Sequence, residues 1–327
     1  MTMNYYEAVH LFIAQRFKSI FFLFVTFSLF FVAYFDSINQ VLSKWLNDEL
    51  YSHGFLTLLV FIYLSIQKIK TKQAFSFEPS IWAIIPTFIF SILWLMGVLT
   101  DIQLIEYFML PSIIGGIIWG LAGDKFAKKI FIPLCILLLA TPGWGILNPV
   151  LQHMTVTVVG YTLDLIKIPA LIENIYVTTP YGRFSVEGGC SGLRYLLVAG
   201  ILGLTYAELH LEKKWEKIMV FISMIFAALV SNWVRVGALI VIGNQTQMQH
   251  SLMKEHDFFG WIIFLIMCLV VYFFLRKWGK FEEPIKVNDH ECEYDSAFTT
   301  KKIEIFKVMM LMITVILLPM SYSLGWA

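Results

Sequence analysis

The apolar stretch IMVFISMIFAALVSNWVRVGALIVI, residues 218–242, decides the class of this protein. A helix needs about 20 mostly apolar residues to cross the hydrocarbon core of a bilayer, and the only charged residue in this stretch is Arg235. Over all 327 residues, 58% are hydrophobic and 14% are charged, whereas a soluble domain carries about 25% charged residues. The composition therefore excludes a single water-soluble domain and indicates a polytopic membrane protein.

Further apolar stretches on both sides of this one predict an all-α integral membrane protein, a helical bundle with about 8–9 transmembrane helices. The second stretch is short, and the fifth is interrupted near Pro142 and Gly143. No gap between stretches is long enough for an ordinary catalytic domain, so any chemistry must use span ends and short loops. The predicted spans are 19–35, 54–66, 81–99, 104–121, 130–147, 190–207, 218–242, 257–275 and 303–325.

Basic residues predict the orientation, because Lys and Arg in short loops favour the cytoplasmic side. With the N-terminus inside, inner segments hold 17 Lys and Arg and outer segments hold 4, which predicts the N-terminus inside and the C-terminus outside. The first span lacks a small-residue cleavage site and is interpreted as an uncleaved anchor. We predict one multi-span domain over 1–275, a cytoplasmic loop over 276–302 and a C-terminal transmembrane segment over 303–327.

In this topology three adjacent spans bring a thiol, a guanidinium and an imidazole to the outer leaflet: Cys190, Arg235 and His256. A soft nucleophile, a fixed positive charge and a base are the groups needed for acyl transfer through a thioester.

Most cysteines in membrane helices are small hydrophobic residues, and Cys135 and Cys268 fit that interpretation because they lie inside apolar runs. Cys190 differs because it stands at the start of a span, where the helix dipole favours the thiolate. Two glycines precede it, and Arg194 follows at i+4 on the same helix face, one turn deeper, where its charge would favour a thiolate. We therefore predict that Cys190 is reactive.

Arg235 lies inside a span, at a cost of at least about 2.5–3.5 kcal/mol, so it requires a partner or a polar cavity. Asn232 lies at i−3 on the same face. A structural ion pair or snorkelling to the outer surface is the alternative. Among the outer histidines, His256 is preferred because a helix start fixes its position. The others are His53, His153 and His250.

Other features predict less. The stretch 175–186 is rich in Thr, Tyr and Val and predicts a small hairpin around Pro180-Tyr181-Gly182. The stretch 149–168 has apolar residues at helical spacing and predicts an interfacial helix.

His290 and Cys292 make a poor zinc site. We predict neither a metal nor an organic cofactor. A net charge of +1 gives no field to hold nucleic acid, so no nucleic-acid partner is expected.

Three blocks resemble the exosortase/archaeosortase family: residues 186–195 (VEGGCSGLRY), 232–236 (NWVRV) and 256–261 (HDFFGW). Residues 51–56 (YSHGFL) resemble its early block, and the likeness covers about residues 40–275, with core motifs over 186–261. Several relatives carry a soluble outer domain after the last span, whereas this chain ends at Ala327.

The resemblance implies a membrane cysteine protease or transpeptidase that cleaves C-terminal sorting signals, of which the PEP type is the best known. By that resemblance Cys190 is the nucleophile, Arg235 the oxyanion stabiliser and His256 the proton-transfer residue. Arg194 is an alternative stabiliser, which the sequence leaves open. The supporting residues are Arg194, Asn232, Glu187, Gly189, Ser191 and His53.

The partners implied are exported proteins whose C-terminus carries a motif, a hydrophobic segment and a basic tail, together with membrane lipid and an amine acceptor. The resemblance places the protein in a bacterial inner membrane with its active site on the periplasmic or extracellular face. The competing interpretation is a non-enzymatic transporter, or a lipid- or polysaccharide-handling scaffold, with a polar intramembrane pocket around Arg235.

Overall fold

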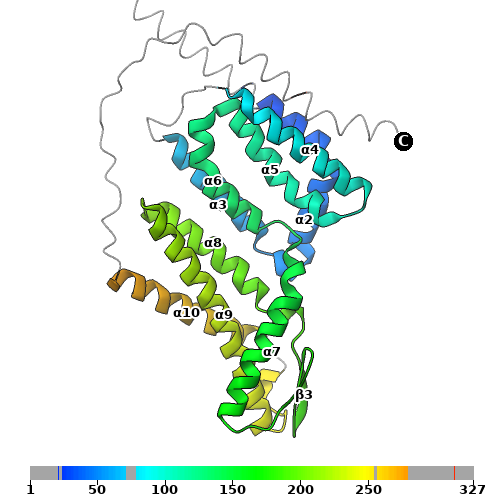
Figure 1. The fold of residues 1–327 in the computed structure, drawn as a ribbon, viewed down its shortest axis with the longest axis vertical. Helices are drawn as coiled ribbons and strands as arrows, with labels where there is room; N and C mark the ends of the chain where they lie inside the picture. The colour runs from blue at the N-terminus through cyan, green and yellow to red at the C-terminus, as the bar shows by residue number, and fades with distance from the viewer. Residues whose placement is uncertain (1–20, 22–23, 71–78, 254–255, 279–312, 314–327) are drawn as a thin grey trace, which may run out of the picture. The chain divides into compact units, whose positions relative to one another are not determined.

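The structure is a computed structural model in which residues 21, 24–70, 79–253, 256–278 and 313 are described (Figure 1). Helices make up most of this part of the chain. The α-helices after the first helical segment, Phe24–Ala33, are α2 Phe35–Asn47, α3 Gly54–Lys70, α4 Ile84–Leu99, α5 Gln103–Ala122, α6 Asp124–Leu139, α7 Asn148–Leu165, α8 Leu193–His210, α9 Lys214–Gln245 and α10 His256–Trp278. Short 3-10 turns precede several of them, namely η1 Glu49–Tyr51, η2 Ile81–Ala83, η3 Trp144–Leu147, η4 Gly188–Cys190 and η5 Ser251–Met253.

The predicted all-α membrane fold is confirmed in its main feature. Five described helices are long and apolar enough to cross a membrane, or up to seven spans if each bent helix pair counts as one. The weak second span is one of the five, over Glu49–Lys68. The interruption near Pro142 and Gly143 is present, because α6 ends at Leu139 and α7 begins at Asn148.

Not every predicted span has a counterpart of the expected kind. Helix α8 is not among the five, because Arg194, Glu208 and His210 lower its hydropathy. The first predicted span is described only in part, and Phe24–Ala33 is bent by 79° against α2. The ninth predicted span lies outside the described residues apart from position 313, and the orientation stays a prediction.

The described chain forms two compact units. The first contains the chain up to Asn47 and Leu58–Pro142, and the second contains Asp48–Thr57 and residues 143–278. Most of the predicted loop 276–302 and of the segment 303–327 lies outside the described residues.

A buried polar layer joins α2, α4 and α5 in the first unit. Ser37 donates to the Glu106 carboxylate and accepts from Trp94 Nε1 at 3.0 Å. Tyr34 Oη lies 3.1 Å from Ser91 Oγ. Polar groups that leave water lose free energy unless they form hydrogen bonds, so this layer requires a specific pairing of the three helices.

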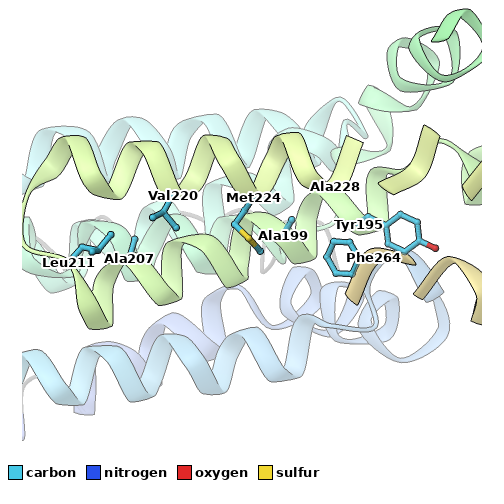
Figure 2. Packing of buried hydrophobic residues seen from close by; sticks show 8 residues of the cluster. All are labelled: Tyr195, Ala199, Ala207, Leu211, Val220, Met224, Ala228 and Phe264. Atoms are coloured by element: carbon cyan, nitrogen blue, oxygen red, sulfur yellow. The ribbon is translucent and has the colours of Figure 1, made fainter. Parts of the chain in front are cut away.

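Small residues let α8 and α9 pack closely in the second unit, and α10 packs beside them (Figure 2). Ala199, Ala207 and Ala228 are buried in their shared core, and close backbone approach of this kind stabilises helix pairs in membranes. Tyr195 stacks on Phe264 of α10, with ring centroids 5.2 Å apart. This core holds the first turns of α8 against α9 and α10.

A small sheet qualifies the all-α prediction. Strands β1 Leu171–Glu173, β2 Tyr176–Thr179 and β3 Gly182–Ser185 form an antiparallel sheet in the order β1-β2-β3. The hairpin predicted around Pro180-Tyr181-Gly182 is confirmed, with Thr179 opposite Gly182. Strand β1 was not predicted, because three residues are too few to show an alternating pattern.

We expect Gly116→Ala to lower the stability of the first unit. A Cβ at Gly116 would lie 3.0 Å from the Cβ of Thr87, whose buried hydroxyl donates to the Ala83 carbonyl at 2.6 Å. Overpacking of this kind costs about 1–3 kcal/mol. Gly237→Ala on α9 is the matched control, because a Cβ there has nothing within 4 Å and alanine favours a helix over glycine by up to about 1 kcal/mol.

Thermal unfolding in detergent measures both variants. The apparent Tm should fall for Gly116→Ala and stay level or rise for Gly237→Ala. An unchanged Tm for Gly116→Ala would contradict the packing described for α4 and α5.

Candidate active site

Cys190 ends the 3-10 turn η4, directly before α8. Its N–H donates to the Glu187 carbonyl at 2.8 Å, and the Ser191 N–H donates to the Gly188 carbonyl at 3.3 Å. Gly192 then adopts a left-handed conformation with φ +89°, which glycine accepts without strain. The turn therefore ends sharply and presents Cys190 ahead of the helix rather than within it.

Ser191 and Asn148 tie this turn to α7. Ser191 Oγ accepts the Leu193 N–H at 3.2 Å, and so satisfies a donor at the start of α8. The same hydroxyl lies 2.8 Å from Asn148 Oδ1 and 2.8 Å from the Gly188 carbonyl oxygen. A hydroxyl has one proton to donate, so these two acceptors share it.

Asn232 of α9 holds the carbonyl of Cys190. Its Nδ2 donates to the Cys190 oxygen at 2.9 Å and to Thr155 Oγ1 of α7 at 3.1 Å. Gly192 lies directly against this amide, because a Cβ at Gly192 would come 2.8 Å from Asn232 Cγ. The polar face predicted for α9 thus serves to fix the backbone at the thiol.

Arg235 holds the preceding carbonyl and is 1% exposed. Its Nη1 donates to the Gly189 oxygen at 3.2 Å, and its guanidinium lies 5.6 Å from the centroid of the Tyr195 ring. A charged group this deeply buried needs hydrogen bonds to offset its lost hydration. The structure brings the Arg235 block and the Cys190 block together.

Helix α10 packs against Arg235 through Gly260. A Cβ at Gly260 would lie 2.6 Å from Arg235 Cδ and 2.7 Å from Nε, and it would also overlap the Tyr195 hydroxyl. A side chain at this position would require Arg235 or Tyr195 to move. His256 begins α10, so its backbone lies one turn before Gly260 on the same helical face. The His256 side chain lies outside the described part of the structure.

Arg194 lies apart from the carbonyls that Arg235 and Asn232 hold. Its guanidinium is 3.3 Å from Ser52 Oγ, 3.5 Å from Glu49 Oε2 and 5.1 Å from the centroid of the Trp261 ring. The prediction that Arg194 shares a helix face with Cys190 is wrong, because α8 begins only at Leu193 and Gly192 interrupts the helical path.

The remaining predicted residues surround this centre. Glu187 and Gly189 are exposed on the turn. His53 is half-buried between η1 and α3, and its carbonyl accepts Thr57 Oγ1 at 2.8 Å. Of the other histidines weighed, His153 is exposed on α7, and His250 Nδ1 accepts the Leu252 N–H at 3.2 Å. His290 and Cys292 lie outside the described residues.

Four residues of the centre were not predicted as site residues: Asn148, Thr155, Tyr195 and Gly260. Asn148 and Thr155 are seven residues apart, which places them on one face of α7. That spacing is the signal in the sequence, but it does not show which helix the face meets. Tyr195 and Gly260 lie inside the quoted blocks, where an aromatic and a glycine look like ordinary helix-packing residues.

The two glycines before Cys190 have open space beside them. A Cβ at Gly189 would meet nothing within 4 Å, and a Cβ at Gly188 would meet only Asn148 Nδ2, at 3.5 Å. The N–H groups of Cys190 and Ser191 donate within the turn. A guanidinium has five N–H donors, and one donor of Arg235 already reaches the carbonyl of Gly189, the residue before Cys190.

A sequence model of transmembrane exosortases matches residues 45–273. The chain belongs to this family. Comparisons of this chain with curated proteins and with solved structures give no match. All the contacts described around Cys190 lie within the matched residues, and the exosortase is a multi-pass membrane protein. At the level of the family, membership implies a membrane cysteine transpeptidase for sorting signals.

We expect Asn232→Leu to destabilise the exosortase more than Thr155→Val does. The leucine leaves the Cys190 carbonyl without its donor, and an unsatisfied buried polar group costs about 1–3 kcal/mol. Thr155→Val is the matched control, because it removes the other acceptor of the amide and keeps the bond to Cys190.

The measurement is the apparent Tm of both purified variants in the same detergent. The loss for Asn232→Leu should exceed that for Thr155→Val. Equal losses would mean that the bond to Cys190 contributes nothing to stability.

Proposed function

We propose that this exosortase is a membrane-embedded cysteine protease and transpeptidase. It cleaves the C-terminal sorting signal of exported proteins at the outer face of the cytoplasmic membrane and transfers them to an acceptor through a thioester. The observation that carries this proposal is the pair of hydrogen bonds from α9 to the carbonyls of Gly189 and Cys190. They place a buried guanidinium beside the turn that presents the thiol.

In the proposed reaction the Cys190 thiolate attacks the scissile carbonyl carbon, and a new C–S bond forms while the carbonyl oxygen becomes an oxyanion. An N–H of Arg235 stabilises that oxyanion, and one such donor is worth about 2.7–4 kcal/mol. The C–N bond then breaks, and protonated His256 gives its proton to the leaving amine. This leaves a thioester on Cys190 and a neutral imidazole.

The second half of the reaction releases the enzyme. The amine of an acceptor, or water, attacks the thioester and passes its proton to His256, and the Cys190 thiolate departs. The substrates in this proposal carry a short motif, a hydrophobic segment and a basic tail, and the hydrophobic segment lies in the membrane. The distribution of Lys and Arg supports an active site on the outer face.

Cys190→Ala should abolish processing, because no other group in the mechanism can form the acyl intermediate. Mass spectrometry of the C-terminal peptides of exported proteins in the native host measures this at matched enzyme level. A set of proteins should keep its hydrophobic, basic tails in Cys190→Ala. Cys135→Ala is the control, because Cys135 lies inside α6 and has no role in the mechanism.

Identical tail profiles in wild type and Cys190→Ala would contradict the proposal. Buried Arg235 would then have to be examined as part of a transport or scaffold site.

Arg235→Lys should lose processing activity, whereas Arg194→Lys should retain more of it. Lysine keeps the charge but loses the planar fork that reaches the Gly189 carbonyl. Loss of one oxyanion donor typically lowers kcat by about 100- to 1000-fold. Arg194 contacts Ser52, Glu49 and Trp261 instead, so its replacement should act mainly through local packing.

Processing rates of the two variants, compared at equal abundance in the membrane, test this assignment. A larger loss for Arg194→Lys than for Arg235→Lys would move the stabilising role to Arg194.

A further inference from the structure

Strand β3 ends five residues before the thiol and forms one edge of the sheet. The sheet order β1-β2-β3 leaves β3 with a strand neighbour on one side only. The chain runs from Ser185 through Val186 and the glycine turn directly to Cys190. At about 3.3–3.6 Å per residue, the strand and the nucleophile are within reach of one short extended peptide.

The register shows which backbone groups of β3 face that edge. The Val186 N–H donates to the Ile175 carbonyl at 2.8 Å, which makes residues 175 and 186 a hydrogen-bonded pair. Bonded and non-bonded pairs alternate along an antiparallel ladder. Residues 184 and 182 therefore bond to β2, and the N–H and C=O groups of Arg183 and Ser185 point to the open edge.

Nothing in the described part of the chain pairs with this edge. Among the residues that the structure describes, no backbone hydrogen bond reaches Arg183 or Ser185 from outside the sheet. The cluster that α7 and α9 share with the sheet uses the face that carries Val177 and Phe184. The Arg183 guanidinium lies 3.8 Å from the centroid of the Tyr176 ring on β2, so this side chain leans over the sheet and not across the edge.

The glycine turn that precedes the thiol is open. Gly188 and Gly189 are exposed, and a Cβ at Gly189 would meet nothing within 4 Å. An exposed strand edge is a template for pairing with another chain. Peptide-binding proteins use such an edge to hold an extended segment through main-chain hydrogen bonds.

We propose that the extended segment of the substrate next to the scissile bond binds as an added β-strand on β3. Its backbone pairs with Arg183 and Ser185, and its continuation passes over the glycine turn to Cys190. This inference rests on the proposed function, because it names how the same site holds its peptide. Affinity then comes from main-chain bonds, and alternate side chains of the peptide face the same side.

Proline substitution tests the edge, because proline removes an N–H and is tolerated on edge strands. Ser185→Pro removes an N–H that faces the open edge of β3. Ile172→Pro is the matched control, because position 172 has the same outward register in β1 at the opposite edge. The substrate is an exported protein whose tail is retained in Cys190→Ala, and alkylation of Cys190 by iodoacetamide reports on the turn without any substrate.

Ser185→Pro should lower the rate of tail cleavage at least tenfold, with iodoacetamide labelling of Cys190 within twofold of wild type. Ile172→Pro should cleave within twofold of wild type. Equal cleavage by Ser185→Pro and Ile172→Pro would overturn strand addition.

If Ser185→Pro also disturbs the turn, cross-linking provides a separate test of strand addition. Arg183→Cys in a Cys190→Ala background is oxidised with substrates that each carry one cysteine near the cleavage site. Strand addition predicts disulfides at alternate substrate positions, whereas uniform or absent cross-linking would overturn it. If Cys190→Ala still removes tails, the proposed function itself fails, and if only the β3 results are negative, strand addition alone fails.

Discussion

Two side chains of one helix hold the backbone that presents the thiol, and the rest of the site depends on them. Asn232 donates to the Cys190 carbonyl and Arg235 donates to the Gly189 carbonyl. Because they lie three residues apart on α9, they face the same side and form hydrogen bonds with two consecutive peptide units. Each bond satisfies a polar group on both partners, which is the condition for keeping such groups away from water. The position of Cys190 is thereby tied to the packing of α9.

That arrangement also explains the small residues around it. A guanidinium buried to 1% exposure is stable only where its neighbours approach closely and supply acceptors or an aromatic face. Gly260 lets α10 come against the Arg235 side chain, and Gly192 lets the turn come against Asn232. Tyr195 offers its ring to the guanidinium and stacks on Phe264, so the same ring belongs to the polar centre and to the apolar core shown in Figure 2. The apolar packing of α8, α9 and α10 and the geometry of the site are therefore one structure.

The small sheet connects the helical core to the turn that carries Cys190. Its inner face shares a hydrophobic cluster with α7 and α9, and that cluster includes the partly buried Cys190. Its last strand leads into the glycine turn, so a peptide aligned on β3 would already point along the turn toward the thiol. A membrane enzyme with short loops has few surfaces on which to align an extended chain, and a strand edge supplies main-chain hydrogen bonds without a large domain.

The sequence alone determined the membrane class, the helical fold, the break near Pro142 and Gly143, the hairpin and the family, because these follow from local hydropathy, turn residues and short motifs. It also singled out Cys190, Arg235 and Asn232. It did not reveal that Cys190 precedes its helix rather than sharing a face with Arg194, because the left-handed Gly192 is one glycine among 20 in the chain. Only the tertiary structure gave Asn148, Thr155, Tyr195 and Gly260 their places, since periodicity shows which residues share a helix face but not which helix that face meets.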